Sequence, residues 1–269
     1  MAAARVLVTR PAAEAQRWTE ALRARGVQAH SLPLIEIAAL ADAADLHAAW
    51  QRLAGPTASS GLVAVMFVSA NAVQHFMAAR PLGLPWPAHT AVQAWGTGPG
   101  TQAALVAAGW PAALVRCPPD DAPSFDSEAL WTLVQTEVQG WSGREVLIVR
   151  GADARGQLAG RDWLALQLQA AGLQVRQCVA YQRRAPLPDE ATLALARQAL
   201  HDDSWWLFSS SEAAQHLAQW LPGEIGAQAR ALATHPRIAE RLRVQGWGRV
   251  ELVPAALEPQ LASIECLSS

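Results

Sequence analysis

Short apolar runs alternate with amphipathic stretches along the chain. The run Val6–Thr9 predicts a buried strand, and the next stretch, Ala12–Arg25, carries apolar residues at helical spacing. Pro11 and Gly26 suit the first turn and the end of that helix. Because later apolar runs alternate with helix candidates in the same way, the pattern predicts an α/β fold with parallel sheets and right-handed crossovers. The later strands are predicted at Val27–Leu32, Val63–Val68, Thr90–Trp95, Val146–Val149, Gln174–Cys178, Trp205–Phe208, Ala231–Ala233 and Val250–Val253, with a helix at Trp163–Ala171 and no helix after the last strand.

The chain also repeats its own pattern. Three segments return in the same order at offsets of 140, 141 and 137 residues. They are Val6–Arg10 with Val146–Arg150, Phe67–Phe76 with Phe208–Leu217, and Thr97–Trp110 with Thr234–Trp247. Such order and spacing indicate a duplicated α/β unit. Two similar lobes leave a cleft between them, and small ligands bind preferentially in clefts between domains.

Two stretches extend a predicted strand past its expected end, at corresponding places in the two copies. They are Pro33–Ile37 and Val179–Gln182. Two such strands side by side would connect the lobes, so that the chain leaves the first lobe, builds the second and returns. The segments Pro81–Pro87 and Cys117–Pro123 are rich in proline or glycine and predict loops.

Composition excludes several classes of protein. A length of 269 residues, 51% hydrophobic content and a net charge of −2 suit two globular domains, and give no reason to expect nucleic acid or an anionic membrane as a partner. No apolar run is long enough for a membrane span, and Met1–Arg5 shows no signal-peptide pattern. The three cysteines, Cys117, Cys178 and Cys266, fit a reducing compartment, so we expect a cytoplasmic protein.

All 21 basic residues are arginine, as expected of a high-GC bacterial genome. The lack of lysine excludes a P-loop lysine, a pyridoxal phosphate Schiff base and a lysine nucleophile. The seven histidines show no metal-ligand spacing, and His75 and His216 are repeat partners that we interpret as helix-face or capping residues. We therefore expect neither a metal nor an organic cofactor.

A set of motifs in a fixed order resembles one protein family. The motifs are Val6–Pro11, Pro33–Ile37, Phe67–Val73, Leu147–Gly151, Gly172, Tyr181–Arg184 and His235–Ala239. Together they resemble uroporphyrinogen-III synthase, the cofactor-free cyclase of tetrapyrrole synthesis, over Val6 to about Val253.

The resemblance implies two flavodoxin-like, parallel-sheet lobes joined by a two-stranded β linker. The first lobe would comprise residues 1–35 and 183–269 and the second residues 38–178, with linkers at about 33–37 and 179–182. The implied reaction closes hydroxymethylbilane with inversion of ring D through a spiro intermediate, and the substrate would be handed over transiently by the upstream deaminase. The alternatives are a two-lobed small-molecule sensor without chemistry and a nucleotide-dependent enzyme.

Tyr181 is the only tyrosine of the chain. One interpretation is a core tyrosine with a satisfied hydroxyl. The resemblance implies another, because Tyr181 occupies the place of the family's proposed acid in the second linker, facing the cleft. A phenol held within hydrogen-bond reach can protonate a hydroxide leaving group.

Polar and glycine residues follow several predicted strands and open helices. They are Ser69, Asn71, Gly98, Gly100, Thr101, Ser210 and Ser211. They serve either as helix caps, Thr101 included, or as hydroxyls and amides that bind the substrate's carboxylates. The glycine turn lacks the full dinucleotide fingerprint, because the last glycine position holds Thr101.

Three arginines are further candidates. Arg10 and Arg150 occupy corresponding predicted strand ends, where they either form salt bridges or contact substrate. Arg237 and Ile238 stand where members of the family carry threonines, which makes Arg237 a propionate contact under the resemblance.

Overall fold

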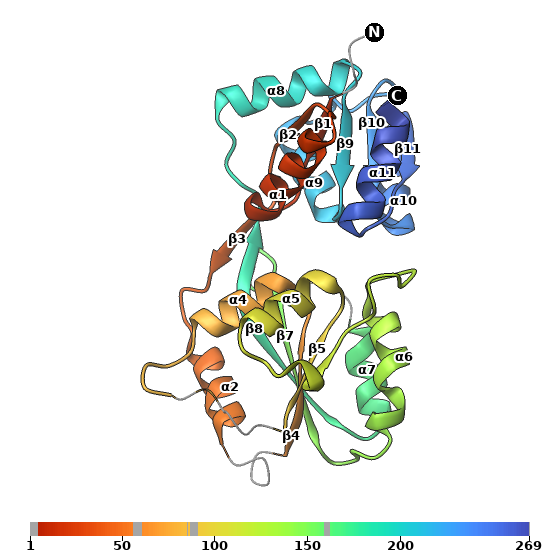
Figure 1. Ribbon diagram of the computed structural model, residues 1–269. Coiled ribbons are helices and arrows are strands. Elements are labelled where there is room, and N and C mark those ends of the chain that lie inside the picture. Colours follow the sequence, from red (N-terminus) through yellow and green to blue (C-terminus); the bar gives the residue numbers. More distant parts are fainter. Residues whose placement is uncertain (1–4, 56–60, 85, 87–90, 159–161, 269) are drawn as a thin grey trace. The chain divides into compact units, whose positions relative to one another are not determined.

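The structure, a computed structural model, describes residues 5–55, 61–84, 86, 91–158 and 162–268. The chain forms two compact units (Figure 1). Residues 1–36 and 184–269 make up one, which we call the split unit, and residues 37–183 make up the continuous unit. The chain thus leaves the split unit once, completes the continuous unit, and returns.

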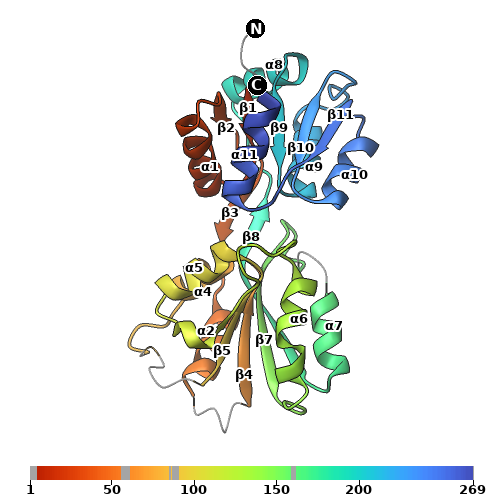
Figure 2. The same cartoon turned by 45° about the vertical axis from the view of Figure 1, so that its right-hand side comes forward.

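The split unit is a five-stranded parallel sheet in the order β11-β10-β9-β1-β2. Helices α1 and α11 lie on one side of the sheet (Figure 2). Trp205 and Leu207 of the central strand face the core on that side. Trp206 and Phe208 face the other side, where Trp206 Nε1 donates a hydrogen bond to the Ala199 carbonyl of α8. This alternation lets one short strand support both helix layers. The strands are β1 (Val6–Val8), β2 (Ala29–Ser31), β9 (Trp205–Phe208), β10 (Arg230–Ala233) and β11 (Arg249–Leu252); the helices are α1 (Ala12–Ala24), α8 (Glu190–His201), α9 (Ser211–Trp220), α10 (Pro236–Val244) and α11 (Leu257–Ser268).

The continuous unit contains a six-stranded sheet in the order β3-β8-β7-β4-β5-β6. One face packs on α2, α4 and α5 and the other on α6 and α7, each with its own apolar core (Figure 1). The strands are β3 (Glu36–Ala39), β4 (Leu62–Phe67), β5 (Gln93–Gly96), β6 (Val115–Arg116), β7 (Glu145–Ala152) and β8 (Gln174–Arg184). The helices are α2 (Ala44–Ala54), α4 (Ala70–Ala78), α5 (Pro99–Ala107), α6 (Ser127–Val138) and α7 (Trp163–Ala170), with a 3-10 turn, η1, at Ala112–Leu114.

The sequence repeat does not coincide with the units. The matched segments place β1 with β7, β9 with β4 and β10 with β5, and these pairs hold the same positions in the two sheet orders. However, β1, α1 and β2 of the first copy join the last strands of the second copy, and β7, α7 and β8 of the second copy join the strands of the first. Each unit therefore combines parts of both copies, and one copy of the repeat does not correspond to one unit.

Several predicted boundaries change. Strand β7 runs to Ala152, so Arg150 lies inside the strand and not at its end, and β8 continues without a break from Gln174 to Arg184. The last strand is followed by α11, contrary to expectation, and Leu261 and Ile264 of that helix are buried. The segment Cys117–Pro123 is a loop as predicted. Met1–Ala4, Thr90 and part of the predicted loop Pro81–Pro87 lie outside the described residues.

In the part of the chain that the structure describes, no helix has the length and apolarity needed to cross a membrane.

Candidate active site

The candidate residues of each unit gather at one edge of its sheet. In parallel sheets the carboxyl ends of the strands share an edge, and ligands of open α/β sheets bind there. The continuous unit brings together the loops after β4 and β5 with the last part of β8. The split unit does the same for the loops after β1, β9 and β10. The first group comprises Ser69, Asn71, Gly98, Gly100, Thr101 and Tyr181, and the second Arg10, Ser210, Ser211 and Arg237.

A β-bulge sets the direction of the Tyr181 side chain. The register between β7 and β8 shifts after Arg150, which pairs with Val179, so that Gly151 pairs with Tyr181 and Ala180 is the extra residue. A bulge places two successive side chains on one face of a sheet. Ala180 and Tyr181 accordingly both join the core beneath α4, and only 3% of Tyr181 is exposed.

Gly151 makes room for the tyrosine ring. A Cβ atom at position 151 would lie 2.6 Å from Cε2 and 3.0 Å from the hydroxyl oxygen of Tyr181. Real Cβ atoms do not approach other atoms so closely, and the nearby atoms belong to a ring enclosed in the core. The tyrosine can therefore lie over this point of β7 only because residue 151 is glycine.

The Tyr181 hydroxyl meets the first turn of α4. Its oxygen lies 3.1 Å from Ser69 Oγ, and Ser69 is the N-cap of α4, whose Oγ accepts a hydrogen bond of 3.2 Å from the Ala72 backbone N–H. Ser69 itself is half-buried. The two hydroxyls thus form a pair between the end of β8 and the start of a helix.

His75 lies beside this pair, with its ring centroid 5.5 Å from that of Tyr181 and the two planes 32° apart. Burial lowers the pKa of His75 below its ordinary value of 6.5, which favours the neutral imidazole at pH 7. From the sequence, His75 is only a helix-face residue. The contact depends on the bulge in a distant strand, which leaves no signal near His75.

The turn before α5 is built around glycine. Gly98 is the N-cap and carries no side chain to accept the helix's free N–H groups, and a Cβ there would lie 3.1 Å from Cβ of Phe125. The Cys117 thiol accepts backbone hydrogen bonds from Gln102 and Gly98, yet burial raises the pKa of Cys117 to about 11. The structure thus places a neutral thiol against this turn.

Thr101 and Gly100 differ in accessibility. Thr101 is only 5% exposed, and its N–H donates to the Gly98 carbonyl at 3.0 Å, so it lies within the first turn and does not cap the helix. This overturns the interpretation of Thr101 as the cap. Gly100 is exposed, with no other atom within 4 Å of the position that a Cβ would take.

Side chains cap the equivalent helices of the split unit. Ser210 Oγ accepts the Glu212 N–H at 3.2 Å, and Ser211 is the first residue of α9. His235 Nδ1 accepts the Arg237 N–H at 3.1 Å, and the Arg237 side chain is exposed.

Arg10, which follows β1, and Arg150, which lies within β7, both have protein partners. Arg10 lies 3.3 Å from Glu14, and its guanidinium lies 4.0 Å from the centroid of the Trp18 ring. Arg150 is 3% exposed and donates to Asp162 at 2.7 Å and to Gln177 at 2.8 Å. The salt-bridge interpretation therefore describes contacts that both residues make, while a contact of either with substrate stays a prediction.

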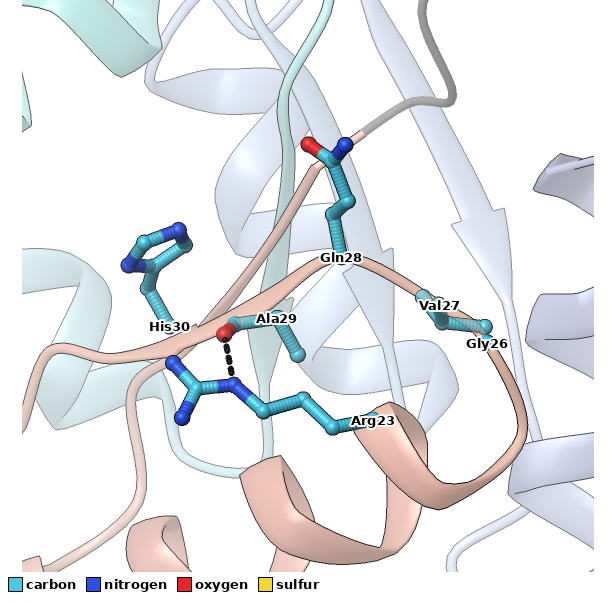
Figure 3. Close-up of a pocket in the computed structure, with 6 residues that line it drawn as sticks. All are labelled: Arg23, Gly26, Val27, Gln28, Ala29 and His30. Carbon is cyan, nitrogen blue, oxygen red and sulfur yellow. Dashed lines mark hydrogen bonds between the residues drawn. The ribbon is translucent and has the colours of Figure 1, made fainter.

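Two hollows in the surface of the split unit lie away from these residues. One of about 290 Å³ is bounded by the end of α1 and the start of β2, where Arg23 Nε donates to the Ala29 carbonyl at 2.8 Å and His30 lies beside it (Figure 3). Another, of about 380 Å³, lies before β9, β10 and β11. Both lie where strands begin, opposite the edge at which ligands of parallel sheets bind.

Comparison with known proteins places the chain in a family. The family profile described as uroporphyrinogen-III synthase HemD matches residues 16–258. The uroporphyrinogen-III synthase of Salmonella typhimurium is 31% identical over 256 residues, which cover 93% of this chain and 95% of that protein. The chain belongs to the uroporphyrinogen-III synthase family. The resemblance drawn from the motifs is thereby confirmed.

Solved structures agree with this family's fold. A mutant uroporphyrinogen III synthase from Thermus thermophilus has a TM-score of 0.58 at 16% identity, with 98% of each chain covered. Uroporphyrinogen-III synthetase from Helicobacter pylori has a TM-score of 0.59 at 15% identity, with 98% of this chain and 99% of that chain covered. At such identities the likeness establishes the fold alone, and it confirms the predicted α/β class with two mostly parallel sheets.

Proposed function

We propose that this chain is a lyase-type cyclase of haem biosynthesis that converts hydroxymethylbilane to uroporphyrinogen III. Its membership of the uroporphyrinogen-III synthase family supports this activity over a sensor without chemistry. The observation that ties the activity to particular residues is the Tyr181–Ser69 hydroxyl pair at the carboxyl edge of the continuous unit.

The reaction begins with a poor leaving group. Hydroxide leaves the open-chain substrate more easily when a positioned acid protonates it, and the Tyr181 phenol is the proposed source of that proton. The substituted carbon of ring D then attacks the resulting azafulvene, which gives the spiro intermediate. Fragmentation and reclosure invert ring D, and the proton released as the last pyrrole ring regains aromaticity restores the phenol.

Most of the remaining catalysis is positioning of a flexible substrate. Holding the reacting carbons close together replaces an improbable encounter with a favoured one. Neutral donors suit this task, because they hold carboxylates without retaining the product as strongly as several cations would. The proposed carboxylate contacts are Ser69, Asn71, Gly98, Gly100 and Thr101 in the continuous unit, and Ser210, Ser211, Arg10 and Arg237 in the split unit, with Arg150 a further candidate.

The proposed setting is the cytoplasm, because Cys117, Cys178 and Cys266 are all free thiols. The partner is the tetrapyrrole substrate, received by transient hand-over from the upstream deaminase. No group of three or more metal-binding side chains occurs among the described residues, and independence of metal and cofactor stays a prediction.

The test is turnover of enzymatically made hydroxymethylbilane, with the product isomers separated. The wild-type chain should form the type III isomer without added nucleotide or metal. Tyr181→Phe should lose at least about tenfold in rate, near the lower end of the 10²–10⁴-fold typical of general acids, because the pyrrole nitrogen also expels the hydroxide. Type I product, which forms without enzyme, should rise in proportion.

Each alternative gives a different result. A sensor would bind the substrate and leave the spontaneous formation of type I unchanged. A nucleotide-dependent enzyme would stay inactive until nucleotide is added. Tyr181→Phe with full type III turnover would remove Tyr181 from the role of acid.

A further inference from the structure

The Tyr181 hydroxyl is poorly placed to touch a substrate directly. The ring lies between Gly151 and His75, the residue is 3% exposed, and the hydroxyl ends against Ser69 Oγ. Ser69, in contrast, is half-buried and lies in the loop at the carboxyl edge of the sheet. Of the two hydroxyls, the serine is therefore the one that a ligand at this edge can reach.

Either hydroxyl of the pair could donate by geometry, and the hydrogen-bonding capacity of Ser69 favours Tyr181 as the donor. A serine hydroxyl has one proton to donate and two lone pairs to accept with. One lone pair accepts the Ala72 N–H. If Tyr181 donates to the other, both acceptor sites are filled and the serine proton points away from the protein groups. The reverse direction would bury the tyrosine proton beside apolar neighbours, which costs more than it returns.

We propose that Ser69 is the hydroxyl that contacts the leaving group of the substrate, and that Tyr181 acts through it as a positioning residue and proton source. The inference rests on the proposed function. In the concerted step the Ser69 O–H bond breaks as its proton joins the leaving oxygen, the substrate C–O bond breaks, and water departs. The Tyr181 proton moves to Ser69 Oγ at the same time. The proton that the substrate releases on final closure returns along the same path.

His75, which lies beside the two hydroxyls, is not assigned as the proton donor. His75 meets Tyr181 through a contact between the two rings, whereas the Tyr181 hydroxyl is directed at Ser69. Since burial lowers the pKa of His75 below its ordinary value of 6.5, the cationic imidazolium, which is the acidic form of histidine, is disfavoured at neutral pH.

The kinetic test compares Ser69→Ala, Ser69→Thr, Tyr181→Phe and the double variant in turnover of hydroxymethylbilane. Ser69→Ala should lower kcat by at least about tenfold, as Tyr181→Phe does, with KM changed less than about threefold. The double variant should be no slower than the slower single variant, because both changes break one path. Ser69→Thr, which keeps a hydroxyl, should recover most of the loss.

Loss of the helix cap needs its own control. Asp189 caps α8 and accepts the Thr192 N–H at 2.7 Å, as Ser69 caps α4. Asp189→Ala should lower the melting temperature by about 2–4 °C, as Ser69→Ala should, and leave kcat unchanged. Equal losses of kcat in Ser69→Ala and Asp189→Ala would show that the serine only stabilises the fold.

The single tyrosine allows a measurement that needs no turnover. Tyrosine labelled with ¹³C at Cζ should give one NMR signal, from Tyr181. Ser69→Ala should shift that signal, and Ser69→Thr should return it toward the wild-type position.

The outcomes separate the inference from the function on which it rests. A wild-type chain that makes no type III isomer overturns the proposed function and the relay with it, although the NMR result would still report the hydroxyl pair. An active wild type with full kcat in Ser69→Ala overturns the relay alone. So does a double variant whose loss is the product of the two single losses.

Discussion

The two units use equivalent positions of the repeat for different purposes. Ser69 and Ser210 cap equivalent helices, and a histidine follows six residues later in each, His75 and His216. In the continuous unit His75 lies against the Tyr181 ring. In the split unit His216 is buried, with Nδ1 2.6 Å from the Leu34 carbonyl. The repeat keeps the cap and the helix in both units, while the strand beside the helix decides what chemistry is present.

The bulge accounts for this difference. In the split unit β1 ends at Val8 and pairs with β2 without a shift, as the equivalent residues Val146–Ile148 of the longer β7 do with β8. In the continuous unit the equivalent pair, β7 and β8, contains the shift after Arg150 that turns Tyr181 toward α4. A change of one residue in register is enough to exchange which side chains face a core.

The turns that precede the equivalent helices α5 and α10 also differ between the two units. His235 accepts an N–H of its own helix, α10, so that turn is closed by a local side chain. Gly98 begins α5 without a side-chain cap and receives the Cys117 thiol from the loop after β6. The turn before α5 is thus formed without a side-chain cap and the turn before α10 with one, and this distinguishes the two units.

The largest effect should come from Gly151→Ala, which removes the feature that makes the units differ. The new Cβ would lie 2.6 Å from the Tyr181 ring, so the ring must shift, and we expect its hydroxyl to move away from Ser69. We expect turnover to fall at least as far as in Tyr181→Phe, and the free energy of unfolding to fall by about 1–3 kcal/mol from overpacking. Turnover assays and urea unfolding measure the two losses.

Gly140→Ala is the matched control for that substitution. A Cβ at residue 140 meets only the Glu137 carbonyl, at the ordinary contact distance of 3.5 Å. This variant should keep wild-type turnover and stability. If Gly151→Ala behaves in the same way, Tyr181 does not depend on the close approach to β7.

Most of the fold can be predicted from the sequence, because its signals are local. Apolar runs mark the strands, and helix-stop glycines such as Gly26 and Gly172 adopt the positive φ angles of 79° and 85° that such positions require. Helix α11 was not predicted, although the sequence contains a signal for it. Leu261 and Ile264 have helical spacing, and Pro259 lies in the first turn. The exchange of strands between the copies was indicated only by the linker stretches Pro33–Ile37 and Val179–Gln182, because the match of two segments does not say with which strands each of them pairs.

The site is less predictable, because its decisive contacts join distant parts of the chain. Tyr181 and Ser69 stand out as a lone tyrosine and a helix cap, yet their contact spans 112 residues and depends on a bulge that no local pattern encodes. The same holds for Cys117 against the Gly98 turn. For Arg150 the sequence suggested a wrong position. Its match to Arg10 predicted a strand end, whereas β7 continues past it beside the long β8.

A smaller effect should distinguish the two equivalent histidines. His216→Ala leaves the buried Leu34 carbonyl without its partner and opens a cavity, so we expect a loss of about 2–3 kcal/mol in the free energy of unfolding. His75→Ala, at a half-buried position, should lose less than about 1 kcal/mol. Denaturant unfolding of both variants measures the contrast. Equal losses would mean that the two helices rely on their histidines alike, and that the units differ less than their contacts indicate.

The smallest expected effect is a loss of stability at low pH, to which one histidine of each unit contributes. Burial lowers the pKa of His75 in the continuous unit and of His30 in the split unit, where Arg5 and Arg23 add to the effect. A histidine whose pKa is lowered by folding takes up a proton more readily when unfolded. Its contribution is therefore complete at pH 7 and is lost as the pH falls below the ordinary value of 6.5.

Carboxylates whose pKa is lowered by folding affect stability at a lower pH than these histidines do. The pKa of Glu36 is lowered mainly by its hydrogen bond from Arg184, and that contribution is lost only as the pH falls below the ordinary value of 4.5. Between pH 7.5 and 5.5 the melting temperature should therefore fall by a few degrees, and His30→Gln and His75→Gln should each remove part of that fall. His47→Gln, an exposed substitution on α2, controls for the loss of one imidazole. Calorimetry in which both variants keep the full wild-type dependence would show that other groups in the folded chain set its response to acid.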